Sequence, residues 1–270
     1  MGTDVKITIL GCGGSGGTPL ICGHWGNCDE NEPKNKRTRA SIAIQSETTT
    51  IIIDTGADFR QQILRENITD IDAVIYSHSH ADHINGFDDL RYASIKQRIN
   101  GQDDYITPIH ADEITLNNMK SIFPYMFVIS DDGLYRPLIS DNVFNDGEDI
   151  TIGDITVQTF RQIHGSGASN GFRIGNIGYS TDVSEMTDAG LAKLQGIHTW
   201  IVDCGQYGST EDELTVHPNL ERVLRWNETV GASKLYLTHL TPRQDYQIIN
   251  IETPNYIQCA YDGLKLMTSV

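Results

Sequence analysis

The sequence predicts an α/β fold in which helices cover the sheets, and three observations lead to this prediction. Short apolar stretches of strand length recur along the whole chain, separated by turn residues. Three longer stretches, residues 81–98, 111–123 and 217–231, are compatible with helices. No linker, repeat or low-complexity tract interrupts the 270 residues. We therefore expect a single domain that spans residues 1–270.

The expected strands follow one another between glycines and polar turn residues. Residues 41–46 and 49–54 predict a hairpin that turns at Glu47, and residues 171–175 and 177–182 predict another around Gly175 and Asn176. A further pair of strands is expected in residues 148–163, on either side of Gly153. The remaining expected strands are residues 5–10, 72–77, 199–205, 233–240 and 264–270.

Four side chains that can bind a metal lie within six residues, directly after the apolar run 72–77. They are His78, His80, Asp82 and His83. Side chains two apart on an extended segment face the same way, so the first two histidines point together, whereas the adjacent Asp82 and His83 diverge from them. Imidazole and carboxylate ligands suit zinc, manganese or iron. Because a single ion cannot easily use all four groups, the cluster predicts two divalent cations.

Three further residues of ligand type, His164, Asp182 and His239, each come just after an expected strand, where side chains of neighbouring strands converge. Three other histidines, His24, His110 and His198, are interpreted as surface or core residues. Two adjacent cations lower the pKa of bound water and supply a hydroxide nucleophile. The predicted ligand set is His78, His80 and His164 for one cation, Asp82, His83 and His239 for the other, and Asp182 for both.

Charge and composition restrict the possible partners. The net charge of −16 argues against non-specific binding to nucleic acid or to an anionic membrane. If the substrate is an anion, a local group must overcome this charge, and a bound metal cluster could do so. The sequence contains no run of 18 apolar residues, so we expect no membrane span, and the first residues do not resemble a signal peptide. Five scattered cysteines suggest reduced thiols and a cytoplasmic protein.

The segment "SHSHADH" resembles the HxHxDH signature of the metallo-β-lactamase superfamily, and the distant His, Asp and His follow in that superfamily's order. The resemblance implies a four-layer αβ/βα sandwich with the metals at one edge between the two sheets. It also implies that Asp54, in "IIIDTG", supports the metal loop without being a ligand. The glycines of "GCGGSG" match a dinucleotide-binding GxGxxG, but no helical pattern follows, so we interpret them as a tight loop near the metals.

Within this superfamily the chain is similar to the PhnP-type phosphoribosyl cyclic phosphodiesterases, through "ILGCGGSGGTP", "EPKNKRTRAS" and "DCGQYGSTEDELTVHPNLERV". This resemblance implies hydrolysis of a small cyclic ribose phosphate diester or a nucleotide-like substrate by a homodimer. It implies that Asp82 orients the hydroxide and that His217 either protonates the departing oxygen or holds a phosphate oxygen. Members of the group can also carry a structural zinc. Here Cys22, His24 and Cys28 remain, but Pro242 stands where a histidine ligand is expected.

Two related hydrolase functions stay open on the sequence alone. A lactonase or thioesterase of the same superfamily would direct the same nucleophile at a carbonyl carbon. A tRNA-processing nuclease shares the metal motif, but it should have a basic surface or insert, which this acidic sequence does not suggest.

Overall fold

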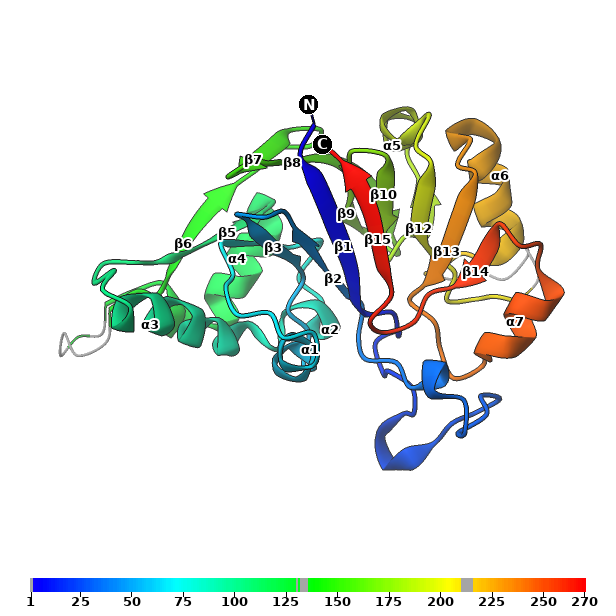
Figure 1. The fold of residues 1–270 in the computed structure, drawn as a ribbon, viewed down its shortest axis with the longest axis horizontal. Coiled ribbons are helices and arrows are strands. Elements are labelled where there is room, and N and C mark those ends of the chain that lie inside the picture. The colour runs from blue at the N-terminus through cyan, green and yellow to red at the C-terminus, as the bar shows by residue number, and fades with distance from the viewer. Residues whose placement is uncertain (1, 130, 132–135, 210–215) are drawn as a thin grey trace.

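The computed structural model describes residues 2–129, 131, 136–209 and 216–270 of the chain. Two sheets face each other, and helices cover the outer side of each (Figure 1). In spatial order, the seven-stranded first sheet contains β15 (Lys265–Ser269), β1 (Asp4–Gly11), β2 (Ser41–Gln45), β3 (Thr50–Ile53), β4 (Ala73–Ile75), β5 (Thr107–Ala111) and β6 (Ile139–Val143).

The second sheet has eight strands. One of its strands is long, and two short strands pair with different parts of the same side of it. The order is β11 (Glu185–Met186) and β7 (Asp149–Ile152) beside β8 (Ile155–His164), then β9 (Gly167–Ile174), β10 (Ile177–Ser180), β12 (Thr199–Asp203), β13 (Lys234–Thr238) and β14 (Ile257–Cys259).

Helices from two separate parts of the chain cover the two sheets (Figure 1). On the first sheet lie α1 (Phe59–Arg65), α2 (Ala81–Ile84), α3 (Arg91–Ile99) and α4 (Glu113–Ile122), and on the second lie α5 (Asp188–Leu194), α6 (Leu220–Val230) and α7 (Tyr246–Glu252). Short 3-10 turns are η1 (Ile21–Gly23), η2 (Pro33–Asn35), η3 (Phe87–Leu90) and η4 (Pro124–Met126).

Three hydrophobic clusters separate these four layers. In β3, Ile51 and Ile53 belong to the cluster between the sheets, whereas Ile52 packs in the cluster under α1–α4. This alternation follows from the two-residue repeat of a strand. It explains why the sequence of a strand is a continuous apolar run when its sheet is covered on both faces. The third cluster joins the second sheet to α5–α7. The layered α/β sandwich expected from the sequence is confirmed.

The direction of the parallel strands determines where the predicted metal ligands lie. Strands β3 to β6 run parallel to one another, and so do β10, β12, β13 and β14. Within each parallel group the chain therefore leaves every strand at the same edge of its sheet. The loops after β3 and β4 meet those after β10, β12 and β13 at one rim between the sheets. This rim holds the side chains described below.

Several expected elements are present with modified bounds. The hairpins of β2–β3 and β9–β10 form as expected, and Gly175 turns the second with φ +53°. The stretch 81–98, which is compatible with a helix, forms α2, η3 and α3. Gly86 lies at the break, where a Cβ atom would be 2.2 Å from the Gly56 carbonyl oxygen. Strands β5, β6, β11 and β14 and helices α1, α5 and α7 were not predicted. Pro108 lies inside β5, and a proline argues against a central strand.

Candidate metal centre and catalytic site

The seven predicted ligands converge at the rim, although they span residues 78 to 239. The loop after β4 and the short helix α2 carry the "HSHADH" residues, β8 ends at His164, and the chain leaves β10 and β13 at Asp182 and His239. Asp182 and His239 have φ values of +51° and +54°, and Asp54, after β3, has +65°. Non-glycine residues in this left-handed region store backbone strain, which concentrates at functional sites.

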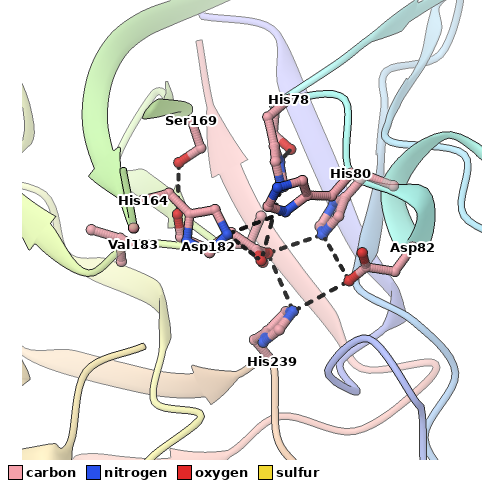
Figure 2. A network of polar contacts seen from close by, with 12 residues as sticks. His78, His80, Asp82, His164, Ser169, Asp182, Val183 and His239 are labelled. Atoms are coloured by element: carbon pink, nitrogen blue, oxygen red, sulfur yellow. Dashed lines mark hydrogen bonds and ion pairs between the residues drawn. The ribbon is translucent and has the colours of Figure 1, made fainter. Parts of the chain in front are cut away.

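The ligands form two groups that share Asp182 (Figure 2). Within each group the candidate ligand atoms lie within 4.8 Å of one another. The Oδ1 atom of Asp182 faces the first group, 3.5 Å from Nε2 of His164 and 4.0 Å from Nε2 of His78. Its Oδ2 faces the second group, 3.0 Å from Nε2 of His83 and 3.3 Å from Nε2 of His239. Each carboxylate oxygen therefore serves a different group.

Several of these nitrogens are unsatisfied, and this tests whether the site fits cations. The Nε2 atoms of His78, His83 and His239 are buried and make no hydrogen bond of good geometry. A buried polar atom without a partner costs about 1–3 kcal/mol, so a folded protein rarely keeps several together. Nε2 of His164 and Nδ1 of His80 face each other at 3.3 Å, as expected for two rings directed at one point. The donor set fits divalent cations such as zinc or manganese.

Asp54 supports the loop that carries the "HSHADH" residues through hydrogen bonds to Ser77 and His83. It is fully buried and accepts three hydrogen bonds: from Nδ1 of His83 (2.7 Å), from the backbone N–H of Ser77 (2.8 Å) and from the Ser77 hydroxyl (2.7 Å). The Ser77 hydroxyl also lies 3.0 Å from Nδ1 of His78. Such bonds fix the ring so that Nε2 points at the metal position. Asp54 thus contacts the loop without lining the centre.

The titration behaviour of the centre follows from burial and from charge. Burial holds the pKa of His78 well below its usual value, with the nearby His83 acting in the same direction. Burial also opposes protonation of His83, but Asp182 and Asp54 outweigh it and raise the pKa of that ring. The carboxyl pKa of Asp182 is lowered, because the surrounding histidines overcome its burial. The site is therefore built to keep its carboxylates ionised.

His217 lies beside the second group and is paired with Asp203. Its Nδ1 is 2.7 Å from Oδ2 of Asp203, and its ring stacks on that of His239 with centroids 4.4 Å apart. Burial lowers the pKa of His217, but the Asp203 carboxylate dominates and raises it to about 9. The pairing with Asp203 therefore favours the protonated form of this imidazole. The sequence reasoning missed Asp203, although it ends a strand in the way that Asp54 and Asp182 follow theirs.

Two glycines permit the close packing around the centre. A Cβ atom at Gly56 would overlap the carbonyl oxygen of Asp82, so only glycine lets the loop after β3 approach α2. A Cβ atom at Gly14 would lie 3.3 Å from the ring of His239. The glycine-rich segment after β1 forms a turn in which the Gly17 amide bonds to the Gly14 carbonyl. This loop lies against the second group, as the sequence interpretation expected.

The segment that contains Cys22, His24 and Cys28 is held by hydrogen bonds. The Cys28 thiol donates to the carbonyl oxygens of Pro242 and Gln244, both at 3.4 Å, and the Asn27 amide donates to Pro242. Among the described residues, the groups that could hold a metal do not include these three side chains. His110 lies in β5, and Nδ1 of His198 lies 2.9 Å from the Thr199 hydroxyl. Neither belongs to the centre.

The helices within the described residues include none with the length and apolar character needed to cross a bilayer.

Comparison with known proteins agrees with this geometry. The family model described as the β-lactamase superfamily domain matches residues 49–240. A solved diphosphatase of the PhnP family is 31% identical, with a TM-score of 0.87, and the match covers 100% of this chain and 99% of that one. The "Probable metallo-hydrolase YhfI" of Bacillus subtilis is 22% identical over 241 residues, 87% of each chain.

An octanoyltransferase of Porphyromonas gingivalis is 26% identical over 263 residues, which are 97% of this chain. The match covers 51% of that protein, so this chain spans about half of its length. Residues 49–240 contain the whole "HSHADH" segment and every other predicted ligand. The chain therefore belongs to the metallo-β-lactamase superfamily, within its PhnP family.

Proposed function

We propose that the protein is a metal-dependent phosphodiesterase that hydrolyses a small cyclic ribose phosphate or a related nucleotide-like diester. The observation that carries the proposal is the pair of ligand groups sharing Asp182, with the Asp203–His217 pair directly beside them. When bound, two divalent cations would neutralise charge on the phosphate and lower the pKa of the attacking water. The seven predicted ligands are the residues that would hold them.

The side chains around the centre orient the attacking water and donate a proton to the departing oxygen. Asp82 has Oδ2 3.3 Å from Nε2 of His83 and 3.6 Å from Nε2 of His239, so its carboxylate borders the second group. Asp82 and Asp182 orient the water for in-line attack. His217 donates a proton to the departing sugar oxygen through Nε2, opposite its bond to Asp203. One P–O bond forms to the water oxygen as the bond to the sugar oxygen breaks, and the water proton passes to solvent.

A substrate panel tests this proposal. Cyclic ribose phosphates, aryl phosphodiesters, diphosphates, lactones and thioesters are assayed with the zinc- or manganese-loaded enzyme. We expect the highest kcat/KM for a cyclic phosphate. Because the similar PhnP-family enzyme is a diphosphatase, a diphosphate is the second candidate, and it needs the same attack at phosphorus. A preference for a lactone or thioester would assign the enzyme to carboxylic ester hydrolysis instead.

The role of His217 is tested separately. His217→Ala should keep the bound metal and lower kcat about 10²- to 10⁴-fold on alkyl esters, whose oxygen needs a proton to depart. The loss should be smaller on 4-nitrophenyl esters, which release a stable anion. An equal loss on both substrate types would contradict the acid role.

A further inference from the structure

A cleft of about 620 Å³ opens onto the first ligand group, and its lining includes His78, His80 and His164. Small-molecule sites usually measure about 300–1,000 Å³, so this cleft has room for more than a phosphate group. His80 is exposed, so the first ligand group is accessible from this side. A part of the substrate that extends beyond its phosphate can therefore lie here.

The cleft lies on the opposite side of the centre from the proposed acid. Val216 and His217 are adjacent in the chain, but Val216 lines this cleft, whereas His217 lines another one beside the glycine-rich turn. In the proposed reaction the departing oxygen faces His217. The sugar that stays on the phosphate, with any group that it carries, can then extend past the first ligand group into the cleft that Val216 lines.

Apolar side chains from separate parts of the chain line this cleft. Ile114 on α4 is 63% exposed, and Val216, just before α6, is 48% exposed. Ala168 in β9 also belongs to the lining. The turn between β8 and β9 contributes Gly165 and Gly167, which place no side chain in the space. Exposed apolar side chains around a concave site are typical of a site for an organic ligand.

The charged side chains of the lining balance each other. Besides the histidines of the centre, the described lining residues include one cationic and one anionic side chain, Arg161 and Asp112. Asp112 accepts hydrogen bonds from the amide and hydroxyl of Thr115 and from the Asn170 side chain. The Arg161 side chain is exposed and makes no hydrogen bond or ion pair within the described part of the chain. This wall favours an uncharged ligand over a second phosphate.

The same two side chains indicate the shape of that ligand. A guanidinium stacks on the face of a planar aromatic ring, and a carboxylate oxygen accepts hydrogen bonds from ring N–H or amino groups. Ile114 offers an apolar surface for such a ring. An uncharged planar ring with N–H donors, as in a purine, matches all three side chains.

We propose that this cleft binds a nucleobase carried by the sugar of the substrate, and that Ile114 and Arg161 are specificity-determining residues. The proposal rests on the proposed function, because the phosphate of the same substrate must lie at the centre. The selected substrates are then nucleoside phosphodiesters, in preference to sugar phosphodiesters that lack a base. Ile114 and Arg161 contact the ring and take no part in the cleavage of the P–O bond.

Kinetic selectivity tests the proposal. The kcat/KM for an adenosine cyclic phosphate is divided by that for the matching cyclic phosphate of methyl riboside, which lacks the base. Ile114→Asn should lower this ratio at least fivefold, and Arg161→Gln at least threefold. Ile122→Asn is the matched control, because Ile122 is an exposed isoleucine of the same helix that does not line the cleft, and it should leave the ratio unchanged. An unchanged ratio in either cleft variant, or an equal fall in Ile122→Asn, would overturn the proposal.

Direct binding separates this proposal from the proposed function. Calorimetry of the metal-loaded protein compares adenosine monophosphate with ribose phosphate, which lacks the base, and with hexyl phosphate, which carries an aliphatic chain instead. The wild type and Ile122→Asn should bind adenosine monophosphate at least tenfold more tightly than ribose phosphate, and Ile114→Asn should lose most of this preference. If the wild type hydrolyses no phosphodiester, the proposed function fails, and this comparison alone decides the proposal. Equal affinity of the wild type for the first two ligands, or tighter binding of hexyl phosphate, would refute it.

Discussion

Replacing Asp54 by asparagine should weaken metal binding without unfolding the protein. Asp54 has φ +65°, a conformation that asparagine adopts as readily as aspartate, so the backbone need not change. The amide nevertheless cannot accept all three hydrogen bonds, which come from Nδ1 of His83 and from the amide and hydroxyl of Ser77. If its NH₂ faces His83, Nδ1 must become the acceptor. The ring proton then moves to Nε2, where the cation should bind.

The magnitude follows from the number of bonds at risk. If the amide turns the other way, it keeps the His83 bond and leaves the Ser77 amide unsatisfied. In either orientation one hydrogen bond to a charged group is lost, which costs about 1.5–3 kcal/mol. We therefore expect a roughly 10- to 100-fold weaker cation affinity, the usual range for a residue that orients a metal ligand.

Competition with a chromophoric chelator measures that affinity, and circular dichroism checks that the variant is folded. Asp70→Asn is the matched control, because Asp70 is an exposed carboxylate paired with Lys96 away from the centre. Wild-type affinity in Asp54→Asn would refute the argument that Asp54 sets the His83 ring. Loss of folding in Asp54→Asn would show that the buried carboxylate contributes mainly to stability.

Three other changes have expected outcomes. Asp182→Ala should lose both cations, because the two carboxylate oxygens of Asp182 face different ligand groups, whereas His164→Ala should weaken binding of only one cation. Elemental analysis that finds both ions retained in Asp182→Ala would contradict the shared role. Gly56→Ala should lower the free energy of unfolding by about 1–3 kcal/mol through overlap with Asp82, while Gly167→Ala, where a Cβ meets only an atom at 3.8 Å, should be neutral in thermal melts. Of the five free cysteines, the exposed Cys22 should react quickly with a thiol reagent at pH 8. The other four thiols are buried, and burial raises the pKa of each, so they should react only in denaturant. Rapid reaction of more than one thiol in the native protein would count against this packing.

The fold and the site were predictable to different extents. The "HSHADH" segment could be identified because its ligand-type residues are adjacent in sequence, and the strand ends indicated where His164, Asp182 and His239 would converge. Their roles as metal ligands stay a prediction. Asp203 also ends a strand, but its partner His217 lies 14 residues further along the chain, and no pattern in the sequence indicates that the two side chains meet.

The missed elements have equally local causes. Strand β14 has three residues, too few for a periodic pattern, and helix α5 contains Gly190, which lowers helix propensity. Strand β6 carries only one buried residue, Ile139, so its sequence lacks the apolar run of an interior strand. Tertiary pairing with β5 determines its conformation instead.

The centre draws its ligands from both halves of the sandwich. One half supplies the "HSHADH" loop and Asp54, and the other supplies His164, Asp182 and His239. Neither sheet can assemble the site alone, and β15, the last strand of the chain, completes the first sheet beside β1. Cations that bind only when the two sheets are packed together would stabilise the folded state relative to the unfolded state. Chelation should therefore lower the cooperativity and midpoint of unfolding as well as turnover.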